Sequence, residues 1–186
     1  MIRKATYEDL PELMEVFGKA REIMRASGNL NQWNDSYPSE EIILNDIENG
    51  YCVLLCERSE TNGAETVIAT MSFIPGPDPT YTYIEKGPWD IKQSPSNGSW
   101  IDDRPYYVIH RIAVAEPGHN AAKTLLDWGF EYIKENDAGH SIRIDTHRDN
   151  VVMHHILRKY GFDLCGVIYL ASGAPRDAYQ KRNGNQ

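Results

Sequence analysis

The segment from Tyr106 to Trp128 constrains the fold most, because an alternating apolar strand there runs through a short turn into an amphipathic helix. The alternation over 106–114 predicts a strand with two faces, one carrying Tyr106, Val108, His110, Ile112 and Val114 and the other Tyr107, Ile109, Arg111 and Ala113. After the Glu-Pro-Gly sequence of 116–118, apolar residues recur every three or four positions, as on a helix face. The sequence therefore predicts a central strand that leads into a helix.

The turn between this strand and this helix has the geometry of a phosphate site. The first backbone N–H groups of a helix have no partner inside the helix, and they lie at its positive end. Phosphate oxygens bind well at such a position. Taken alone, however, the turn is better explained by ordinary packing of a helix on a sheet, because such turns are common and this one contains a single glycine, Gly118.

Length and charge restrict the class of protein. A chain of 186 residues can bury a core without a metal or disulfide, and we expect one domain over 1–182 with a polar tail over 183–186. The formal charge of -8 argues against nucleic acid or a membrane surface as the main partner, because both require clustered cations. An acidic chain is compatible with an amine substrate.

Three cysteines, Cys52, Cys56 and Cys165, lie inside apolar runs, so we expect reduced core residues and not disulfides or metal ligands. The sequence begins without an apolar signal region and contains no apolar stretch of membrane-spanning length. These features predict a cytoplasmic protein.

The rest of the chain alternates between helical and extended patterns. Apolar spacing and capping residues predict helices over 6–27, 39–50 and 150–160, and strands over 2–5, 51–57, 66–74, 141–146, 162–169 and 176–181. The turn over 59–64 joins two of the strands in a hairpin. The long segment over 75–105 is rich in Pro, Gly and aromatic residues, which favours a folded substrate wall or a surface that packs on a partner subunit, as in a homodimer.

This order of elements resembles the GNAT superfamily of acyl-CoA-dependent N-acetyltransferases over nearly the whole chain. The residues that carry the resemblance are His110-Arg111-Ile112-Ala113, the stretch over 143–150, and the closing segments 165–169 and 178–181. They look like an uncharacterised bacterial branch of the superfamily. The resemblance implies an α/β fold with a mixed sheet of about seven strands and about four helices. It also implies transfer of acetyl from acetyl-CoA to an amine of a small molecule or a peptide.

The resemblance also implies a set of cofactor contacts. These are Ile112, Ala113 and Val114 for the pantetheine arm, the turn residues Gly118, His119, Asn120, Ala121, Ala122 and Lys123 for the pyrophosphate, and Asn150. The turn departs from the superfamily pattern, since Pro117 stands in place of Gln or Arg and Asn120 in place of Gly. The usual tyrosine acid is replaced by Leu157. A degenerate member that binds a ligand or partner without acetyl transfer is therefore the alternative.

Histidines are the candidate catalytic bases. His110 stands on the central strand where many superfamily members have Glu, and histidine titrates near neutral pH; a buried structural histidine is an equal alternative. His147 is the second candidate, with a turn-capping role as its alternative. No metal is expected, because zinc-type spacing is absent. The candidate substrate walls, for which plain packing is the alternative, are Trp33, Tyr37, Tyr81 and Trp89.

Overall fold

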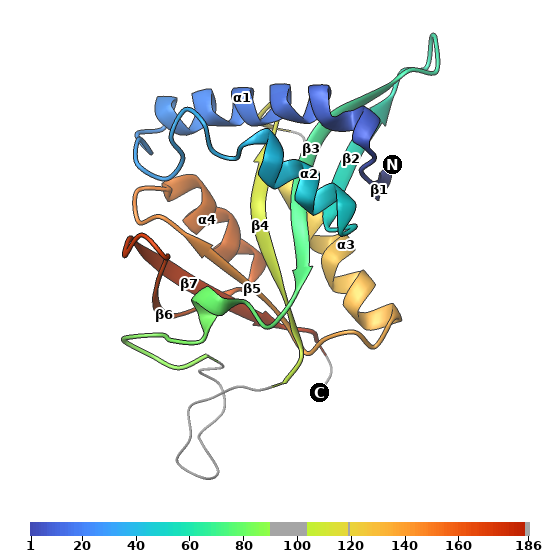
Figure 1. Cartoon of the computed structure of the whole chain (residues 1–186). Coiled ribbons are helices and arrows are strands. Elements are labelled where there is room, and N and C mark those ends of the chain that lie inside the picture. Colours follow the sequence, from blue (N-terminus) through green and yellow to red (C-terminus); the bar gives the residue numbers. More distant parts are fainter. Residues whose placement is uncertain (90–103, 119, 185–186) are drawn as a thin grey trace.

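The computed structural model describes residues 1–89, 104–118 and 120–184 (Figure 1). The elements, in chain order, are β1 (Ile2–Lys4), η1 (Tyr7–Asp9), α1 (Leu10–Ala26), α2 (Glu40–Glu48), β2 (Cys52–Arg58), β3 (Glu65–Pro75), η2 (Pro79–Tyr81), β4 (Tyr106–Val114), α3 (Ala121–Glu135), β5 (Ser141–Thr146), α4 (Val151–Tyr160), β6 (Asp163–Tyr169) and β7 (Pro175–Arg182). The predicted elements are all present, with ends that differ by a few residues.

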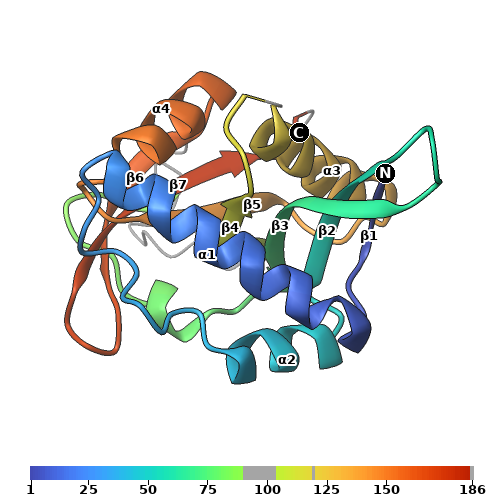
Figure 2. The same ribbon diagram turned by 90° about the horizontal axis from the view of Figure 1, so that it is seen from above.

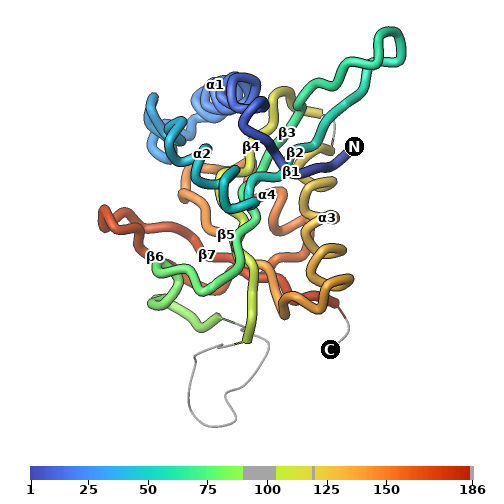
Figure 3. The backbone as a smooth tube through the Cα atoms, turned by 45° about the vertical axis from the view of Figure 1, so that its right-hand side comes forward, coloured from blue at the N-terminus to red at the C-terminus, as the bar shows by residue number. Residues whose placement is uncertain are grey.

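A single sheet of seven strands has the order β1-β2-β3-β4-β5-β7-β6. Neighbouring strands are antiparallel except for β4 and β5, which are parallel. The mixed sheet and the four α-helices confirm the predicted fold class. The β2–β3 hairpin is also confirmed, and its turn extends beyond the body of the molecule (Figure 3).

The helices lie in two layers, with α1 and α2 on one face of the sheet and α3 and α4 on the other (Figure 2). Each layer buries its own core, because strand side chains alternate between the two faces. The α1–α2 layer covers Leu13, Phe17, Ile43, Leu54, Val67 and Ala113, and the α3–α4 layer covers Met71, Phe73, Ile109, Leu125, Leu126, Ile142 and Leu157.

The parallel strands β4 and β5 pair over a short distance. Only Tyr106, Tyr107 and Val108 have partners on β5, and the last of these pairs is Val108 with Arg143. From Ile109 to Val114, this edge of β4 has no strand partner among the described residues. Side chains and backbone groups can therefore meet a ligand between the two strands.

A β-bulge interrupts β4. Arg111 and Ile112 together stand opposite the single residue Met71 of β3, and Arg111 adopts a left-handed backbone with φ of 52°. The predicted alternation is wrong beyond this point. Ile109 packs in the core under α3 and α4, whereas Ala113 packs in the core under α1 and α2, although both were expected on one face. The extra residue of the bulge shifts the alternation by one position.

The described part of the long segment, up to Trp89, is folded. Tyr81 and Trp89 are buried together against β6 and β7, with ring centroids 5.1 Å apart. Glu85 forms an isolated antiparallel bridge with Val167 of β6. Residues 90–103 lie outside the described part of the chain.

The three cysteines are buried and form no disulfide, as predicted. Among the helices of the described residues, none combines the length and the hydropathy needed to cross a membrane.

Candidate functional site

A cavity of about 500 Å³ opens where β4 and β5 part. Its wall comes from the loop between α1 and α2, from the bulged part of β4, from the end of β5 and from the start of β7. The polar and aromatic residues that line it include Gln32, Trp33, Tyr37, Asp78, His110, Arg111, Asp145 and Arg176. One of the two predicted catalytic histidines, His110, is among them.

His110 forms a close pair with Asp78. Its Nε2 atom lies 2.8 Å from Oδ2 of Asp78, whose other oxygen accepts hydrogen bonds from the backbone and hydroxyl of Thr80 at 2.8 and 2.5 Å. Burial alone would raise the pKa of the Asp78 carboxyl, but the hydrogen bonds from His110 and Thr80 outweigh burial and lower it to about 2. An ionised carboxylate can only accept, so Nε2 of His110 carries the proton of this hydrogen bond, and in the neutral imidazole Nδ1 is then the atom with the lone pair.

Asp145 is a second carboxylate beside His110. Its Oδ1 atom lies 3.8 Å from Nδ1 of His110 and accepts a hydrogen bond of 2.8 Å from the hydroxyl of Tyr81. Its Oδ2 atom lies 3.9 Å from Nε of Arg176. Two carboxylates thus surround the imidazole, which favours any positive charge that develops on it.

A buried ion pair supports the bulge. Arg111 donates from Nε and Nη2 to the two carboxylate oxygens of Asp46 on α2, both at 2.8 Å, and Ser72 donates to Asp46 at 2.5 Å. The Asp46 side chain is 2% exposed and that of Arg111 is 12% exposed. Because of the bulge, the consecutive side chains of His110 and Arg111 both line the cavity.

The four predicted substrate residues divide into two pairs. Trp33 and Tyr37 line the cavity, with ring centroids 5.9 Å apart. Tyr81 and Trp89 do not line it and are 2% and 6% exposed. They lie behind the wall, where the hydroxyl of Tyr81 holds Asp145 and the indole N–H of Trp89 donates to the carbonyl of Tyr81.

His147 lies in the turn after β5 and does not line the cavity. Its Nδ1 atom accepts a hydrogen bond of 3.2 Å from the backbone N–H of Asp149. Burial, and then the charge of Arg176, lower the pKa of His147. This geometry suits a residue that shapes the turn, and the structure does not bring His147 together with His110 at the cavity.

The predicted pantetheine contacts lie on the part of β4 that, within the described ranges, has no strand partner toward β5. Ile112 lines the cavity, Ala113 is buried under α1, and Val114 packs toward α3. Asn150 also lines the cavity, as the N-cap of α4. Its Oδ1 accepts from the backbone N–H of Met153 at 3.0 Å.

The predicted phosphate turn leads into an uncapped helix. Gly118 has φ of 109°, and Asn120, the N-cap of α3, has φ of 51° and makes no side-chain cap hydrogen bond. Ala121 is buried, Ala122 is half-buried, and Lys123 pairs with Asp127 of the next turn at 2.6 Å. His119 lies outside the described residues.

No tyrosine of α4 lines the cavity. Leu157, at the position where the family resemblance implies a tyrosine acid, is fully buried in the core under α3 and α4. The hydroxyl of Tyr160 donates to Asp127 of α3 at 2.6 Å. Burial, and then that hydrogen bond, raise the pKa of Tyr160, so its hydroxyl stays protonated at neutral pH.

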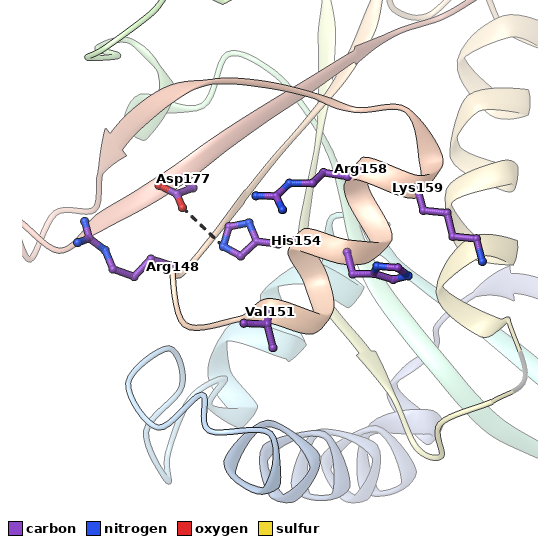
Figure 4. A pocket seen from close by; sticks show the side chains of 7 residues that line it. Arg148, Val151, His154, Arg158, Lys159 and Asp177 are labelled. Carbon is purple, nitrogen blue, oxygen red and sulfur yellow. Dashed lines mark ion pairs between the residues drawn. The ribbon is translucent and has the colours of Figure 1, made fainter.

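A second hollow, the α4 groove, lies over the outer face of α4 and has a volume of about 620 Å³ (Figure 4). It is lined by Arg148, Val151, His154, His155, Arg158, Lys159 and Asp177, none of which was a predicted site residue. Nε2 of His154 lies 3.6 Å from Oδ2 of Asp177, and Nδ1 of His154 lies 2.7 Å from the hydroxyl oxygen of Tyr179. Among the described residues, no group of three or more His, Cys, Asp or Glu side chains could hold a metal ion.

The sequence prediction missed several polar groups that line the cavity together with His110. Asp78 lies in the long Pro-rich segment, Arg176 lies at the start of β7, and Gln32 lies in the loop after α1. Asp145 lies in the stretch over 143–150 that carries the family resemblance, but it was not a predicted site residue. None of these residues carries a local sequence pattern that indicates a contact with β4.

Solved structures of known proteins resemble this chain over its full length. An acetyltransferase of the GNAT family from Streptococcus agalactiae is 31% identical, covers 100% of this chain and 96% of its own, and superposes with a TM-score of 0.79. A GNAT acetyltransferase from Listeria monocytogenes (21% identity, 98% and 94% coverage, TM-score 0.66) and the ribosomal-protein-alanine N-acetyltransferase from Brucella melitensis (20%, 98% and 99%, TM-score 0.60) share the fold. No protein-family model and no curated protein matches the sequence. With 31% identity across the whole chain, and with the parted strands and cavity described above, this protein belongs to the GNAT family of acetyltransferases.

Proposed function

We propose that this protein is an acetyl-CoA-dependent N-acetyltransferase that acetylates an amine of a small molecule or a peptide. The observation that carries the proposal is the pair of His110 and Asp78, 2.8 Å apart, in the wall of the cavity between β4 and β5. A base must remove a proton from the amine before the nitrogen can attack, and a histidine oriented by a carboxylate can do so near neutral pH.

The chain offers two features that suit acetyl-CoA, which supplies an acetyl group as a thioester. In the part of the chain that the structure describes, the edge of β4 at Ile112, Ala113 and Val114 has no strand partner toward β5, so its backbone groups can hydrogen-bond the pantetheine amides. The N-terminus of α3 has no side-chain cap, so its first N–H groups can bind the pyrophosphate. Asn120 adopts a left-handed backbone as glycine would, but it adds a side chain beside the phosphates.

His110 accepts the proton of the acceptor amine in this proposal. The base is the neutral imidazole, in which Nε2 donates to Asp78 and Nδ1 offers the lone pair. The imidazolium that results lies between two carboxylates, with Asp145 3.8 Å from Nδ1. A backbone N–H of Ile112 or Ala113 stabilises the negative charge on the acetyl oxygen while the C–N bond forms. The C–S bond then breaks, and CoA leaves as a thiolate that takes up a proton from solvent or from the His110 imidazolium.

The buried Leu157 supports a second candidate function, ligand binding without acetyl transfer. The family resemblance implies a tyrosine at this position in many superfamily members, where it protonates the departing thiolate, whereas Leu157 belongs to the core of this protein. The altered turn at Asn120 agrees with this alternative. Binding of acetyl-CoA and turnover of an amine distinguish the two functions.

The first experiment is calorimetric titration of the purified protein with acetyl-CoA and with free CoA, followed by an amine screen that detects thiol release. We expect binding at micromolar concentration or below, and turnover that falls about 100-fold in His110→Gln at neutral pH while acetyl-CoA affinity stays the same. His155→Gln, an exposed change in the α4 groove, is the control and should retain full turnover. Unchanged turnover in His110→Gln would exclude this base, and no binding of acetyl-CoA or CoA would favour the second function.

A further inference from the structure

Gln32 lies in the loop between α1 and α2 and lines the cavity. Its side-chain oxygen accepts three hydrogen bonds, from Nδ2 of Asn29 at 2.9 Å, from Nδ2 of Asn150 at 2.8 Å and from the hydroxyl of Thr146 at 3.4 Å. A loop residue that is far away in sequence is thus attached to the ends of β5 and α4.

The orientation of this amide follows from one backbone group. The N–H of Met153 can only donate, and it donates to Asn150 at 3.0 Å, so the accepting atom of Asn150 is Oδ1. The other end of the Asn150 amide is therefore the NH₂ group. Because that NH₂ donates to Gln32, the Gln32 atom that receives it is Oε1, and Nε2 lies on the other side of the amide.

Nε2 of Gln32 has no hydrogen-bond acceptor among the described residues. The side chain is half-buried, and it contributes two N–H donors whose direction the three accepted bonds fix. Because Gln32 lines the cavity and its Nε2 is not fully buried, this donor can pair with a ligand that offers an acceptor oxygen.

Arg176 adds positive charge to the same cavity. It is 7% exposed, donates from Nη1 to the carbonyl of Pro175 at 2.9 Å, and lies 3.9 Å from Oδ2 of Asp145. The other oxygen of Asp145 faces His110. The wall therefore presents the carboxylates of Asp78 and Asp145 to an ammonium group, and it presents the N–H donors of Gln32 and Arg176 to an oxygen.

We propose that the acceptor of this enzyme is an α-amino carbonyl compound, with Gln32 as the residue that selects it. The amine lies at His110, and the carbonyl or carboxylate oxygen beside it accepts from Nε2 of Gln32, with Arg176 favouring a negative oxygen. The inference rests on the proposed acetyl transfer. A simple diamine has no acceptor oxygen and leaves Gln32 unpaired, which should lower its kcat/KM about 10- to 100-fold relative to an α-amino amide.

The test compares kcat/KM for L-alaninamide, L-alanine, trialanine and 1,4-diaminobutane in the wild type and in Gln32→Glu. Glutamate keeps one oxygen for Asn29, Asn150 and Thr146, but it replaces the NH₂ donors with a second oxygen. We expect the ratio of alaninamide to diamine to fall at least tenfold. Asn62→Asp is the control, because it adds the same charge in the β2–β3 turn and keeps its bond to the N–H of Ala64.

L-Alanine and trialanine test whether the α-amino carbonyl group of the acceptor belongs to a free amino acid or to the N-terminus of a peptide. A preference for L-alanine would indicate an amino acid, and a preference for trialanine would indicate a peptide N-terminus. Equal use of diamine and alaninamide by the wild type, or an unchanged ratio in Gln32→Glu, would overturn the proposal. A Gln32→Glu variant in which only the KM for acetyl-CoA changes would also overturn it, since the N–H donors of Gln32 would then bind the cofactor.

Failure of the proposed function gives a different result. If no amine is turned over, acetyl transfer is refuted, and calorimetric binding of the same compounds then tests the selection. Tighter binding of alaninamide than of diamine, lost in Gln32→Glu and retained in Asn62→Asp, supports the role of Gln32. Equal binding contradicts it.

Discussion

Replacing Asp78 by asparagine removes one negative charge from the pair with His110 and changes little in shape. The folded protein lowers the pKa of Asp78 from 3.8 to about 2, and the side chain is 15% exposed, so solvent screens the pair only in part. At 1.36 kcal/mol per pKa unit, this shift corresponds to about 2 kcal/mol of stability at neutral pH. We expect Asp78→Asn to lower the free energy of unfolding by about that amount at pH 7.

The stabilisation that Asp78 provides must decrease as the pH falls. A carboxyl whose pKa is lowered on folding stabilises the protein above its unfolded pKa, near 3.8, and this stabilisation disappears as the pH falls toward the folded value of about 2. Asparagine resembles the protonated acid, so the wild type and Asp78→Asn should converge in acid, with about half of the difference left at pH 3.

Urea denaturation of both proteins at pH 7, 5 and 3 measures this difference. Asp35→Asn is the matched control, because Asp35 pairs with Arg25 on the surface with its side chain 91% exposed, and it should change stability little at any pH. A difference for Asp78→Asn below about 0.5 kcal/mol at pH 7, or one that is equal at pH 7 and pH 3, would refute the reasoning.

Two further variants test the bulge and the missing acid. Asp46→Asn leaves Arg111 buried without its partner charge, so it should lower the free energy of unfolding by about 3–5 kcal/mol in urea denaturation; a loss below 1 kcal/mol would show that the pair is not needed. Tyr160→Phe removes the hydrogen bond to Asp127 and should lower stability by about 1 kcal/mol while steady-state turnover stays the same. A tenfold or larger fall in turnover would instead identify Tyr160 as the acid.

The sequence predicts the sheet and the helices well, because their signals are local. Alternation predicts β4, three- and four-residue spacing predicts α3, and the glycine at Gly161 marks the end of α4, where it adopts φ of 87°. His110 could be selected as a candidate base because the family resemblance places Glu at this position in many members and because histidine titrates near neutral pH. These inferences need only residues that are neighbours along the chain.

The site depends instead on contacts between distant residues. Asp78 and His110 are 32 positions apart, and Gln32 and Asn150 are 118 positions apart. Asp78 lies in a segment whose composition indicates a loop but gives no direction for its side chain. Only the packing of η2 and of the α1–α2 loop against the sheet brings these groups to the cavity, so residue spacing could not reveal them.

Because of the bulge in β4, the face of the sheet on which a residue is expected depends on the end of the strand from which the alternation is counted. Residues counted forward from Tyr106 follow one phase, residues counted back from Val114 follow the other, and the two phases meet at Arg111 and Ile112. Deleting one residue there would remove the shift in alternation, so the side chains on one side of the deletion would move to the opposite face of the sheet. A substitution would change only one side chain. In natural and engineered variants, this strand should therefore tolerate exchanges at the cavity but not changes of length.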